Sequence, residues 1–369
     1  MKLSNTASSV CFIMQHVTPG THMDYVYEMA RTLKEDEGLP LTLLIEKPSA
    51  EVMPPWAIMQ RYKFPLLRIF ENVWLIGRER WRGTKTFYVH YSFLSAISAG
   101  LITKLFGGRV FYWNAGMPWL YKRSWKEDWY QKVAYRLITR LITGAEALIH
   151  GYCQTYGLKP SQVTVIPNWI DIKQITKEVS LKKTVRDELS IPETAPIVLF
   201  VHKLSRRKGA HFLPEIMKQI TVPKVHMVVV GDGPLQQELQ NEINGSEVGN
   251  RVHFLGSVPR ARVKELYQAA DIFIMPSEEE GSPHSLIEAM AYGAPFVAFD
   301  VGGVGETATQ ALLEYVIPFG DTALFCEKIT HLLTNPAHYS HVVSLELQVI
   351  KRYNKATVVE QFKKLISTN

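Results

Sequence analysis

The sequence contains little cysteine. Among its 369 residues there are 3 cysteines, which lie far apart at Cys11, Cys153 and Cys326. They form no CxxC pair and no Cys/His cluster at the spacing of zinc ligands, so the sequence predicts neither a disulfide framework nor a metal site. Scattered cysteines are typical of a reducing compartment, and we expect a cytoplasmic protein.

Long apolar runs are also missing. No stretch approaches the about 20 apolar residues that a membrane-spanning helix requires. The first apolar run, Val10–Met14, is short and ends at Gln15 and His16 without a cleavage-site pattern, which indicates a buried strand and not a signal peptide. We therefore expect a soluble protein, at most associated with the cytoplasmic face of a membrane.

A strong charge of either sign is absent as well. The 41 Lys and Arg against 35 Asp and Glu leave a net charge of +6, a mild excess that favours anionic ligands without naming one. It is too small to predict a nucleic-acid partner, and no nucleic-acid motif is visible. With 46% hydrophobic and 21% charged residues, the composition is that of a globular protein and excludes disorder, collagen and coiled coil.

Short apolar runs alternate with helix-length periodic segments along nearly the whole chain. In the first half the predicted strands are Val10–Met14, Leu41–Ile45, Phe87–His90, Arg109–Trp113, Ala147–His150 and Val163–Pro167. Helices are predicted between them, notably over His22–Lys34 and Leu94–Leu105. Strands that alternate with helices favour a parallel sheet with crossover helices.

A second series of the same kind follows a charged, weakly periodic stretch. Its predicted strands are Ile197–Val201, His226–Val230, Val252–Leu255, Ile272–Met275, Phe296–Phe299 and Tyr315–Ile317. Its predicted helices are Lys208–Ile220, Pro234–Ile243, Arg260–Ala269, Ser285–Ala291 and Thr322–Leu333.

We therefore expect an α/β protein of two doubly wound, Rossmann-like parallel-sheet domains that face a cleft. The expected division is a first domain over residues 1–172, a linker over 173–195, a second domain over 196–350, and a C-terminal segment over 351–369 whose helix packs back on the first domain.

The densest set of polar residues lies in the turn after the predicted strand Ile272–Met275. Glu280 lies in this Gly/Ser/Pro turn, and Glu288 lies within the helix that follows. Both carboxylates can meet one ligand, and ionised carboxylates accept hydrogen bonds from the hydroxyl groups of sugars and riboses. The free N–H groups at the start of the helix, near His284 and Ser285, form an anion site.

Two other loops at the same predicted sheet edge carry cations and glycines. Four cations fall within the six residues from Lys203 to Lys208. Such a run is commonly a solvated loop, but its predicted place beside Glu280 favours an anionic ligand. The glycine-rich loop Val301–Glu306 permits close backbone approach. Together the three loops indicate a nucleoside diphosphate that bears a sugar.

At these residues the chain resembles the GT-B-fold retaining glycosyltransferases of family 4, the group 1 glycosyltransferases. Glu280 to Glu288 match the family's E-x7-E motif, and Lys208-Gly209 match the Lys-Gly after the first strand of its donor domain. Further segments resemble family motifs in the same order, namely Ile166–Asn168 with Asp171, Val228–Pro234, Val252–Gly256 and Gly302–Glu306.

The resemblance implies a metal-independent hexosyltransferase without a cofactor, whose donor is a nucleotide sugar such as a UDP or GDP sugar. Lys203 and Lys208 would neutralise the donor diphosphate. Glu280 would contact the sugar hydroxyls, and Glu288 would bind the ribose hydroxyls. The other implied donor-binding residues are Gly233, Gly281, Pro283, His284, Ser285 and Leu286.

In such an enzyme the sugar would pass, with retention of configuration, to a hydroxyl group of the acceptor. A glycan, a lipid-linked sugar or a small molecule would fit as acceptor, in polysaccharide, lipopolysaccharide or other glycoconjugate synthesis. Three departures from the family pattern leave the donor sugar open. They are His202-Lys203 in place of Gly-Arg, Trp169 in place of a glycine, and Ser282 in place of an aromatic residue.

The first domain is expected to hold the acceptor, with Gly20, His90 and Asn114 as acceptor-side residues. Asn114 occupies the position at which many relatives carry a histidine, and we count it with Glu280 and Lys208 as a predicted catalytic residue. Because an Asn cannot act as a general base, either the substrate phosphate takes the proton or no side-chain base is used. For His90, at a strand end, a structural and a catalytic role are equally open.

The stretch 120–143 has two interpretations. It carries tryptophans and tyrosines among six basic residues and two acidic ones. It can be an interfacial helix that meets anionic lipid, or an amphipathic helix that packs Val133, Leu137 and Leu141 on the core, which is the commoner case.

Two alternative functions remain open, a GT-B-fold sugar-nucleotide isomerase or epimerase and a non-catalytic anion-binding protein. Paired carboxylates would repel a phosphate backbone, which disfavours nucleic acid. A Rossmann dehydrogenase is excluded because Gly231-Asp232-Gly233 lacks the third glycine, at Gln236.

Overall fold

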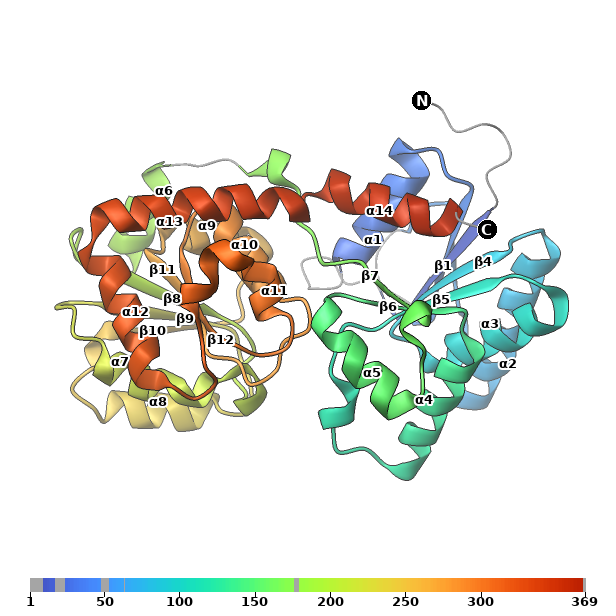
Figure 1. Cartoon of the computed structure of the whole chain (residues 1–369), viewed down its shortest axis with the longest axis horizontal. Helices are drawn as coiled ribbons and strands as arrows, with labels where there is room; N and C mark the ends of the chain where they lie inside the picture. Colours follow the sequence, from blue (N-terminus) through green and yellow to red (C-terminus); the bar gives the residue numbers. More distant parts are fainter. Residues whose placement is uncertain (1–8, 17–23, 48–52, 63, 176–178, 368–369) are drawn as a thin grey trace. The chain divides into compact units, whose positions relative to one another are not determined.

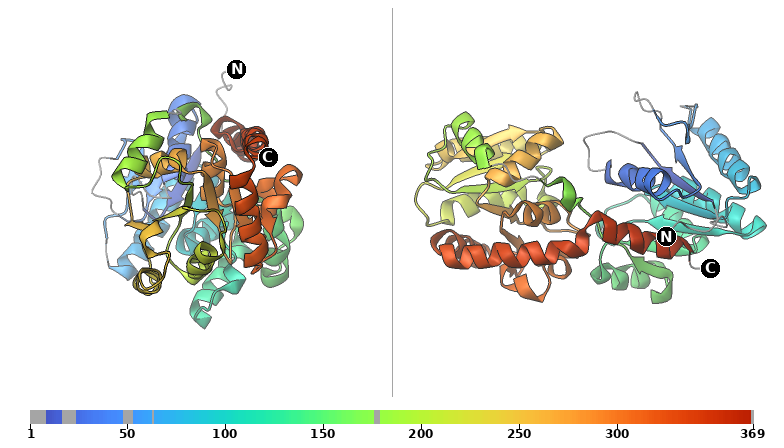
Figure 2. Two further views of the ribbon diagram at one scale, coloured as in Figure 1. Left: turned by 90° about the vertical axis from the view of Figure 1, so that its left-hand side faces the viewer. Right: turned by 90° about the horizontal axis from the view of Figure 1, so that it is seen from above.

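The computed structural model describes residues 9–16, 24–47, 53–62, 64–175 and 179–367. The chain divides into two compact units (Figure 1). The first unit comprises the chain up to Ile166 together with the segment from Val359 onward, and the second comprises Pro167–Val358. Each unit is a parallel sheet with helices on both faces (Figures 1 and 2).

The first unit has a seven-stranded sheet in the order β3-β2-β1-β4-β5-β6-β7. Its strands are β1 (Val10–Met14), β2 (Leu41–Ile45), β3 (Ala57–Met59), β4 (Thr86–His90), β5 (Arg109–Trp113), β6 (Arg140–Thr143) and β7 (Val163–Val165). Its helices are α1 (Asp24–Arg31), α2 (Pro65–Trp81), α3 (Phe93–Phe106), α4 (Trp125–Leu137) and α5 (Ile149–Tyr156). The last helix of the chain, α14 (Lys355–Ser367), contributes Phe362, whose ring packs 5.3 Å from that of Phe12.

The second unit has a six-stranded sheet in the order β10-β9-β8-β11-β12-β13. Its strands are β8 (Ile197–Val201), β9 (His226–Val230), β10 (Val252–Gly256), β11 (Ile272–Met275), β12 (Phe296–Phe299) and β13 (Val316–Ile317). Its helices are α6 (Val179–Glu188), α7 (Leu213–Gln219), α8 (Gln236–Asn244), α9 (Arg260–Ala269), α10 (His284–Tyr292), α11 (Val304–Ala308), α12 (Thr322–Thr334) and α13 (Pro336–Val349).

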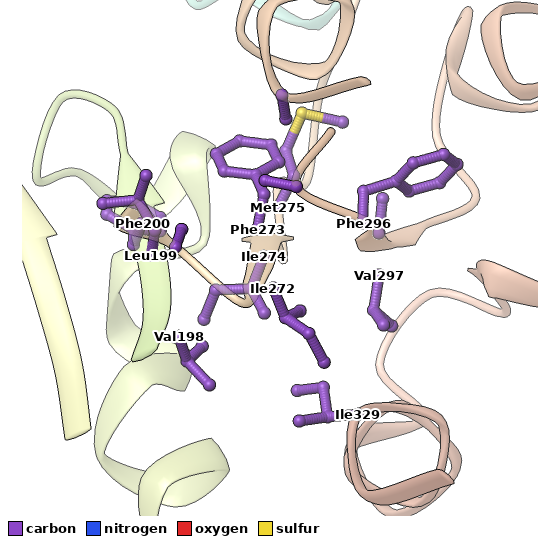
Figure 3. Packing of buried hydrophobic residues seen from close by; sticks show 14 of the residues in the cluster. Val198, Leu199, Phe200, Ile272, Phe273, Ile274, Met275, Phe296, Val297 and Ile329 are labelled. Atoms are coloured by element: carbon purple, nitrogen blue, oxygen red, sulfur yellow. The ribbon is translucent and has the colours of Figure 1, made fainter. Parts of the chain in front are cut away.

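The core of the second unit lies along its three central strands, β8, β11 and β12. Their residues are apolar without alternation, because helices cover both faces of the sheet and every side chain meets a helix. Figure 3 shows Val198, Ile272 and Val297 in this core near Ile329 of α12. The fold of two Rossmann-like parallel-sheet units, expected from the alternating pattern, is confirmed.

Several predicted boundaries need correction. The predicted strand Ala147–His150 is helical, with a 3₁₀ turn over Glu146–Leu148 that runs into α5. The strand of this region is β6, which lies inside the stretch 120–143 that we expected to form one helix. Helix α2 was not predicted from the sequence.

The segment 173–195, expected as a linker, also has structure of its own. It holds helix α6, which packs against α9 in the second unit. Val185 of α6 is fully buried, and Arg186 donates one hydrogen bond to Pro192 O and one to Asp271 Oδ2. These contacts make the segment part of the second sheet's helical layer.

Candidate functional site

Two loops meet where the strand order of the second sheet reverses. Strands β8 and β11 are neighbours in the sheet, although β9 and β10 lie between them in sequence. The loop that starts at His202 follows β8, and the loop that contains Glu280 follows β11. Both leave the carboxyl ends of their strands, and in doubly wound sheets ligands bind at this switch point.

Glu280 is the centre of a buried polar cluster at this point. Its carboxylate oxygen Oε1 accepts a hydrogen bond of 2.7 Å from Lys208 Nζ and one of 2.8 Å from Ser277 Oγ. His202 Nε2 lies 3.2 Å from the same oxygen. In the described part of the chain these three contacts all end on Oε1, so Oε2 keeps its capacity to accept hydrogen bonds from a ligand.

The electrostatics hold this carboxylate in its ionised form. Burial raises the pKa of Glu280, but Lys208 and His202 lower it by more, so the pKa lies well below the ordinary range of a glutamate. Burial and the charge of Lys208 lower the pKa of His202, so this imidazole is neutral at pH 7. Because the carboxylate can only accept, the neutral ring carries its proton on Nε2 and donates it to Glu280.

Glycines allow the loops to approach each other closely. Gly209 has φ +68°, and a Cβ there would lie 1.7 Å from Pro276 O. Gly302 has φ +55°, and a Cβ there would lie 1.7 Å from Glu280 O. A side chain at either position would push the backbone of the Glu280 loop away, so both sites require glycine.

The two lysines predicted to bind the donor lie in different surroundings. Lys208 reaches Glu280, whereas Lys203 is exposed and lies in the same loop without an ion pair in the described part of the chain. At Gly233 a Cβ would lie 2.3 Å from Leu204 O, so this glycine packs the β9 loop against the β8 loop.

Helix α10 begins at His284, three residues after Gly281. Pro283 is the N-cap residue of this helix, and its side chain offers no acceptor to the N–H groups of the first turn. The positive end of the helix dipole therefore points out of this turn, where it can stabilise an anion.

Glu288 lies one turn further along α10. Its Oε1 lies 3.4 Å from His284 Nε2 and 3.8 Å from Arg260 NH2. Burial raises the pKa of Glu288, but His284, Arg260 and Lys264 lower it below its ordinary value. This carboxylate thus forms an ion-paired cluster of its own with His284 and Arg260, separate from the contacts of Glu280.

The sequence did not reveal two further partners of the Glu280 turn. Ser277 is fully buried and donates to Glu280, three residues before it in the chain. The backbone N–H of Asn168 donates to Ser282 Oγ at 3.1 Å, and Asn168 Nδ2 donates to Ser282 O at 2.6 Å. Ser282, which replaces the family's aromatic residue, is therefore fixed by hydrogen bonds to Asn168, which lies near the first residue of the second unit. No local spacing predicts a contact across 114 residues of sequence.

In the first unit, two predicted acceptor-side residues lie at the carboxyl edge of the sheet. His90 ends β4 and stacks on Trp113 with ring centroids 4.3 Å apart. Asn114 follows β5, and both polar atoms of its side-chain amide form hydrogen bonds. Its Nδ2 donates to Tyr135 Oη, and its Oδ1 accepts from Gly116 N. The third predicted residue, Gly20, lies outside the described residues.

The stretch 120–143 holds helix α4 and strand β6. Ala134 and Tyr135 of α4 are buried, while Trp125 and Trp129 are exposed. Leu141, expected on the helix, is buried in β6.

Residues 182–345, which include the whole Glu280 cluster, match the family model described as "Glycosyl transferases group 1". Over these residues the second unit is similar to the group 1 glycosyl transferases. This match supports the resemblance read from the E-x7-E segment. In the described ranges no group of three or more His, Cys, Asp or Glu side chains could hold a metal ion, and no helix could span a membrane.

The chain is also similar to proteins that are named as glycosyltransferases. The chain is 24% identical to a 2-deoxystreptamine N-acetyl-D-glucosaminyltransferase of Streptomyces fradiae over 62% of this chain and 55% of that protein. It is 29% identical to a GDP-mannose-dependent mannosyltransferase of Corynebacterium glutamicum, which acts on a monoacylated phosphatidylinositol monomannoside, over 46% of this chain and 47% of that protein. The alignments thus span about half of each relative's length.

Solved structures extend the likeness to both units. The chain resembles Anabaena Alr3699/HepE in complex with UDP and glucose, with a TM-score of 0.80 and 18% identity over 98% of this chain and 99% of that one. It resembles sucrose-phosphate synthase from Thermosynechococcus elongatus with a TM-score of 0.80 and 20% identity over 97% and 98% of the two chains. At these identities the likeness shows the fold, which is GT-B.

Proposed function

We propose that the protein is a retaining glycosyltransferase. It moves a hexose from a nucleoside-diphosphate sugar to an acceptor hydroxyl group in the synthesis of a polysaccharide, a lipopolysaccharide or another glycoconjugate. The observation that carries the proposal is the ionised carboxylate of Glu280. Its Oε1 contacts Lys208, Ser277 and His202, while its Oε2 can accept a hydrogen bond from a ligand. A carboxylate in this state binds sugar hydroxyl groups and not phosphates.

The donor diphosphate binds beside this carboxylate. Lys208 and the N-terminus of α10 supply positive charge and N–H donors within the two loops that flank the switch point. Glu288 binds the ribose hydroxyl groups. These charges stabilise the leaving diphosphate, and the proposal therefore includes no metal ion and no cofactor.

In the proposed reaction one bond is exchanged for another at the anomeric carbon. The bond from this carbon to the phosphate oxygen breaks, and a bond to the acceptor oxygen forms on the same face of the sugar. The proton of the acceptor hydroxyl passes to the departing diphosphate. No side chain acts as base in this scheme, since both polar atoms of the Asn114 amide are engaged in hydrogen bonds and an amide takes up no proton.

The base of the donor is either uracil or guanine. HepE was crystallised with UDP and with UDP-glucose, and the Corynebacterium relative is named as GDP-mannose-dependent. Whether one base is preferred is decided by a thermal-shift series with UDP, GDP and ADP sugars, in which the bound donor raises the melting temperature.

The test of the function is release of nucleoside diphosphate. The wild type is incubated with the best donor of this series, with and without simple acceptors, and the same assay is run on Glu280→Gln and Lys208→Ala. We expect both variants to lose at least about 100-fold in turnover. Full activity in both would overturn the assigned roles, and an inverted anomeric configuration in the NMR spectrum of the product would overturn retention.

A further inference from the structure

Helix α2 of the first unit carries an apolar stripe that faces away from the core. Phe70 is 72% exposed, Trp74 is 61% exposed and Trp81 is 92% exposed. Leu66 and Val73 are exposed on the same stripe, at the helical spacing that places these residues on one side. Single exposed apolar residues are ordinary, but a stripe along a whole helix marks an interaction surface.

The opposite side of α2 is the one that packs on the first unit. Its buried residues are Asn72, Leu75, Ile76 and Glu79. Asn72 Nδ2 donates to Ser95 Oγ of α3 at 2.7 Å. These buried residues attach the helix to the first unit. The exposed aromatic residues of its outer side are therefore not part of the core of that unit.

The end of α3 continues this surface. Helices α2 and α3 pack side by side (Figure 1). Arg80 of α2 donates through Nε to Gly107 O at 2.7 Å and also bonds to Phe106 O. The exposed Leu105 and Phe106 at the end of α3 are thereby held next to the end of α2. We call the exposed apolar residues of α2 and of the end of α3 the outer face.

Positive charge lies near the ends of the outer face, where Arg78 and Arg82 both pair with the buried Glu79 and leave an excess of one cation. Residues 61–85 contain seven Lys and Arg against two Glu. The Arg78 guanidinium lies 5.0 Å from the centre of the Trp74 ring. Arg82, Lys85 and Lys104 are exposed near the ends of the two helices. Aromatic residues flanked by cations complement the interface of a membrane that contains anionic lipid.

We propose that the outer face docks the protein on the surface of an anionic lipid bilayer. Helix α2 lies in the plane of the interface, with Phe70, Trp74 and Trp81 among the upper acyl chains and the exposed cations near the helix ends at the phosphate groups. At 17 residues the helix is about 25 Å long and lies on the bilayer without crossing it. This inference does not depend on the proposed function, and it assigns the membrane contact to α2 in place of the stretch 120–143.

The test is flotation of the full chain with vesicles, without any donor or acceptor. Wild type is compared with the triple variant Phe70→Ser/Trp74→Ser/Trp81→Ser. The matched controls are Trp125→Ser/Trp129→Ser, which removes the exposed tryptophans of α4, and Phe319→Ser, which removes an exposed aromatic residue of the second unit. Circular dichroism and the melting temperature verify that each variant is folded.

We expect wild type to bind phosphatidylglycerol vesicles at low salt, and to bind them more weakly at high salt and on pure phosphatidylcholine. The triple variant should bind at least about tenfold more weakly than wild type, and Phe319→Ser should bind as wild type does.

Three results would overturn the proposal. The first is absence of binding by wild type, and the second is unchanged binding by the triple variant or loss confined to the α4 variant. The third is a wild-type dimer in sedimentation velocity that the triple variant dissociates, because the outer face would then be covered by a second copy of the chain. A folded triple variant keeps its activity on a water-soluble acceptor, so failure here is separate from failure of the proposed function.

Discussion

Lys208 Nζ lies 2.7 Å from Glu280 Oε1, although the two residues are 72 positions apart in the chain. The pair forms because β8 and β11 are adjacent in the sheet and their loops leave the same edge. The cation assigned to the donor diphosphate is thus already bound to the carboxylate assigned to the donor sugar. Binding of the donor therefore changes the surroundings of both groups at once.

The two lysines of the β8 loop should differ sharply in importance. We expect Lys208→Ala to lower kcat/KM for the nucleotide sugar about 100-fold to 1000-fold, because it removes the cation that pairs with Glu280 and the charge beside the diphosphate. Lys203→Ala removes an exposed lysine of the same loop and should cost less than about tenfold. Steady-state kinetics on both variants measures the difference. Equal losses of kcat/KM in the two variants would show that the Lys208–Glu280 pair does not determine how well the donor is used.

The glycine at position 302 should be required for the shape of the donor site. Gly302→Ala places a Cβ 1.7 Å from Glu280 O in a backbone conformation with φ +55°, so the Glu280 loop must move. We expect the affinity for the donor diphosphate to fall at least about tenfold, as measured by calorimetric titration.

Gly320→Ala is the matched control for this substitution. Gly320 also has a positive φ, +85°, but nothing lies within 4 Å of the added Cβ. Its substitution should cost about 1 kcal/mol of stability and leave donor affinity unchanged. If both variants lose affinity alike, backbone strain and not the contact with Glu280 is the cause.

The contact between Asn168 and Ser282 should stabilise the Glu280 turn. Asn168→Ala removes the bond to Ser282 O, whereas Ser282→Ala removes the bond from Asn168 N. We expect each to cost about 1–2 kcal/mol, and the double variant to cost less than their sum because the residues interact. Denaturant unfolding measures the free energies. Strict additivity would mean that the two hydrogen bonds act independently.

Glu346 of α13 should make the second unit less stable as the pH rises. It is fully buried, accepts one hydrogen bond from Phe296 N at 3.2 Å, and has no partner for Oε2 among the described residues. Burial raises its pKa well above the ordinary value of 4.5. The folded protein therefore keeps the proton that the unfolded chain loses above about pH 5, and stability falls with rising pH.

Glu346→Gln removes this titration. The variant should have a higher melting temperature than wild type at pH 8 and a smaller difference at pH 5, with each unit of pKa worth about 1.4 kcal/mol. Melting curves at pH 5, 6, 7 and 8 measure the slope. A variant that keeps the wild-type slope would assign the pH dependence to other groups.

Much of the second unit was predictable because its strands are uninterrupted apolar runs. β8, β11 and β12 have the bounds that the sequence predicted, since strands buried on both faces contain no polar residue that would make their ends ambiguous. β9 also has its predicted bounds, although it begins with His226. The pattern was weaker around residues 140–150, where Arg140 and Thr143 flank two apolar residues of β6. Two residues are too few to distinguish a strand from the end of a helix.

Helix α2 escaped prediction for a different reason. Its apolar residues lie both on the buried side, at Leu75 and Ile76, and on the exposed side, at Phe70 and Trp74. Periodicity detects a helix when one side is apolar and the other polar. A helix that presents an apolar outer face to a second environment has no such contrast.

The sequence by itself determined the parallel-sheet architecture and the E-x7-E turn. Buried strands, and a turn followed by a helix, depend on residues that are consecutive in the chain, so a local pattern reveals them. The tertiary structure decided which residues meet in that turn. Lys208 and not Lys203 reaches Glu280, Asn168 holds Ser282, and the aromatic residues of α2 point away from the core. The two contacts join segments far apart in the chain, and the exposure of the aromatic residues depends on how α2 packs. Strand order and helix packing decide all three, and a local sequence pattern does not reveal either.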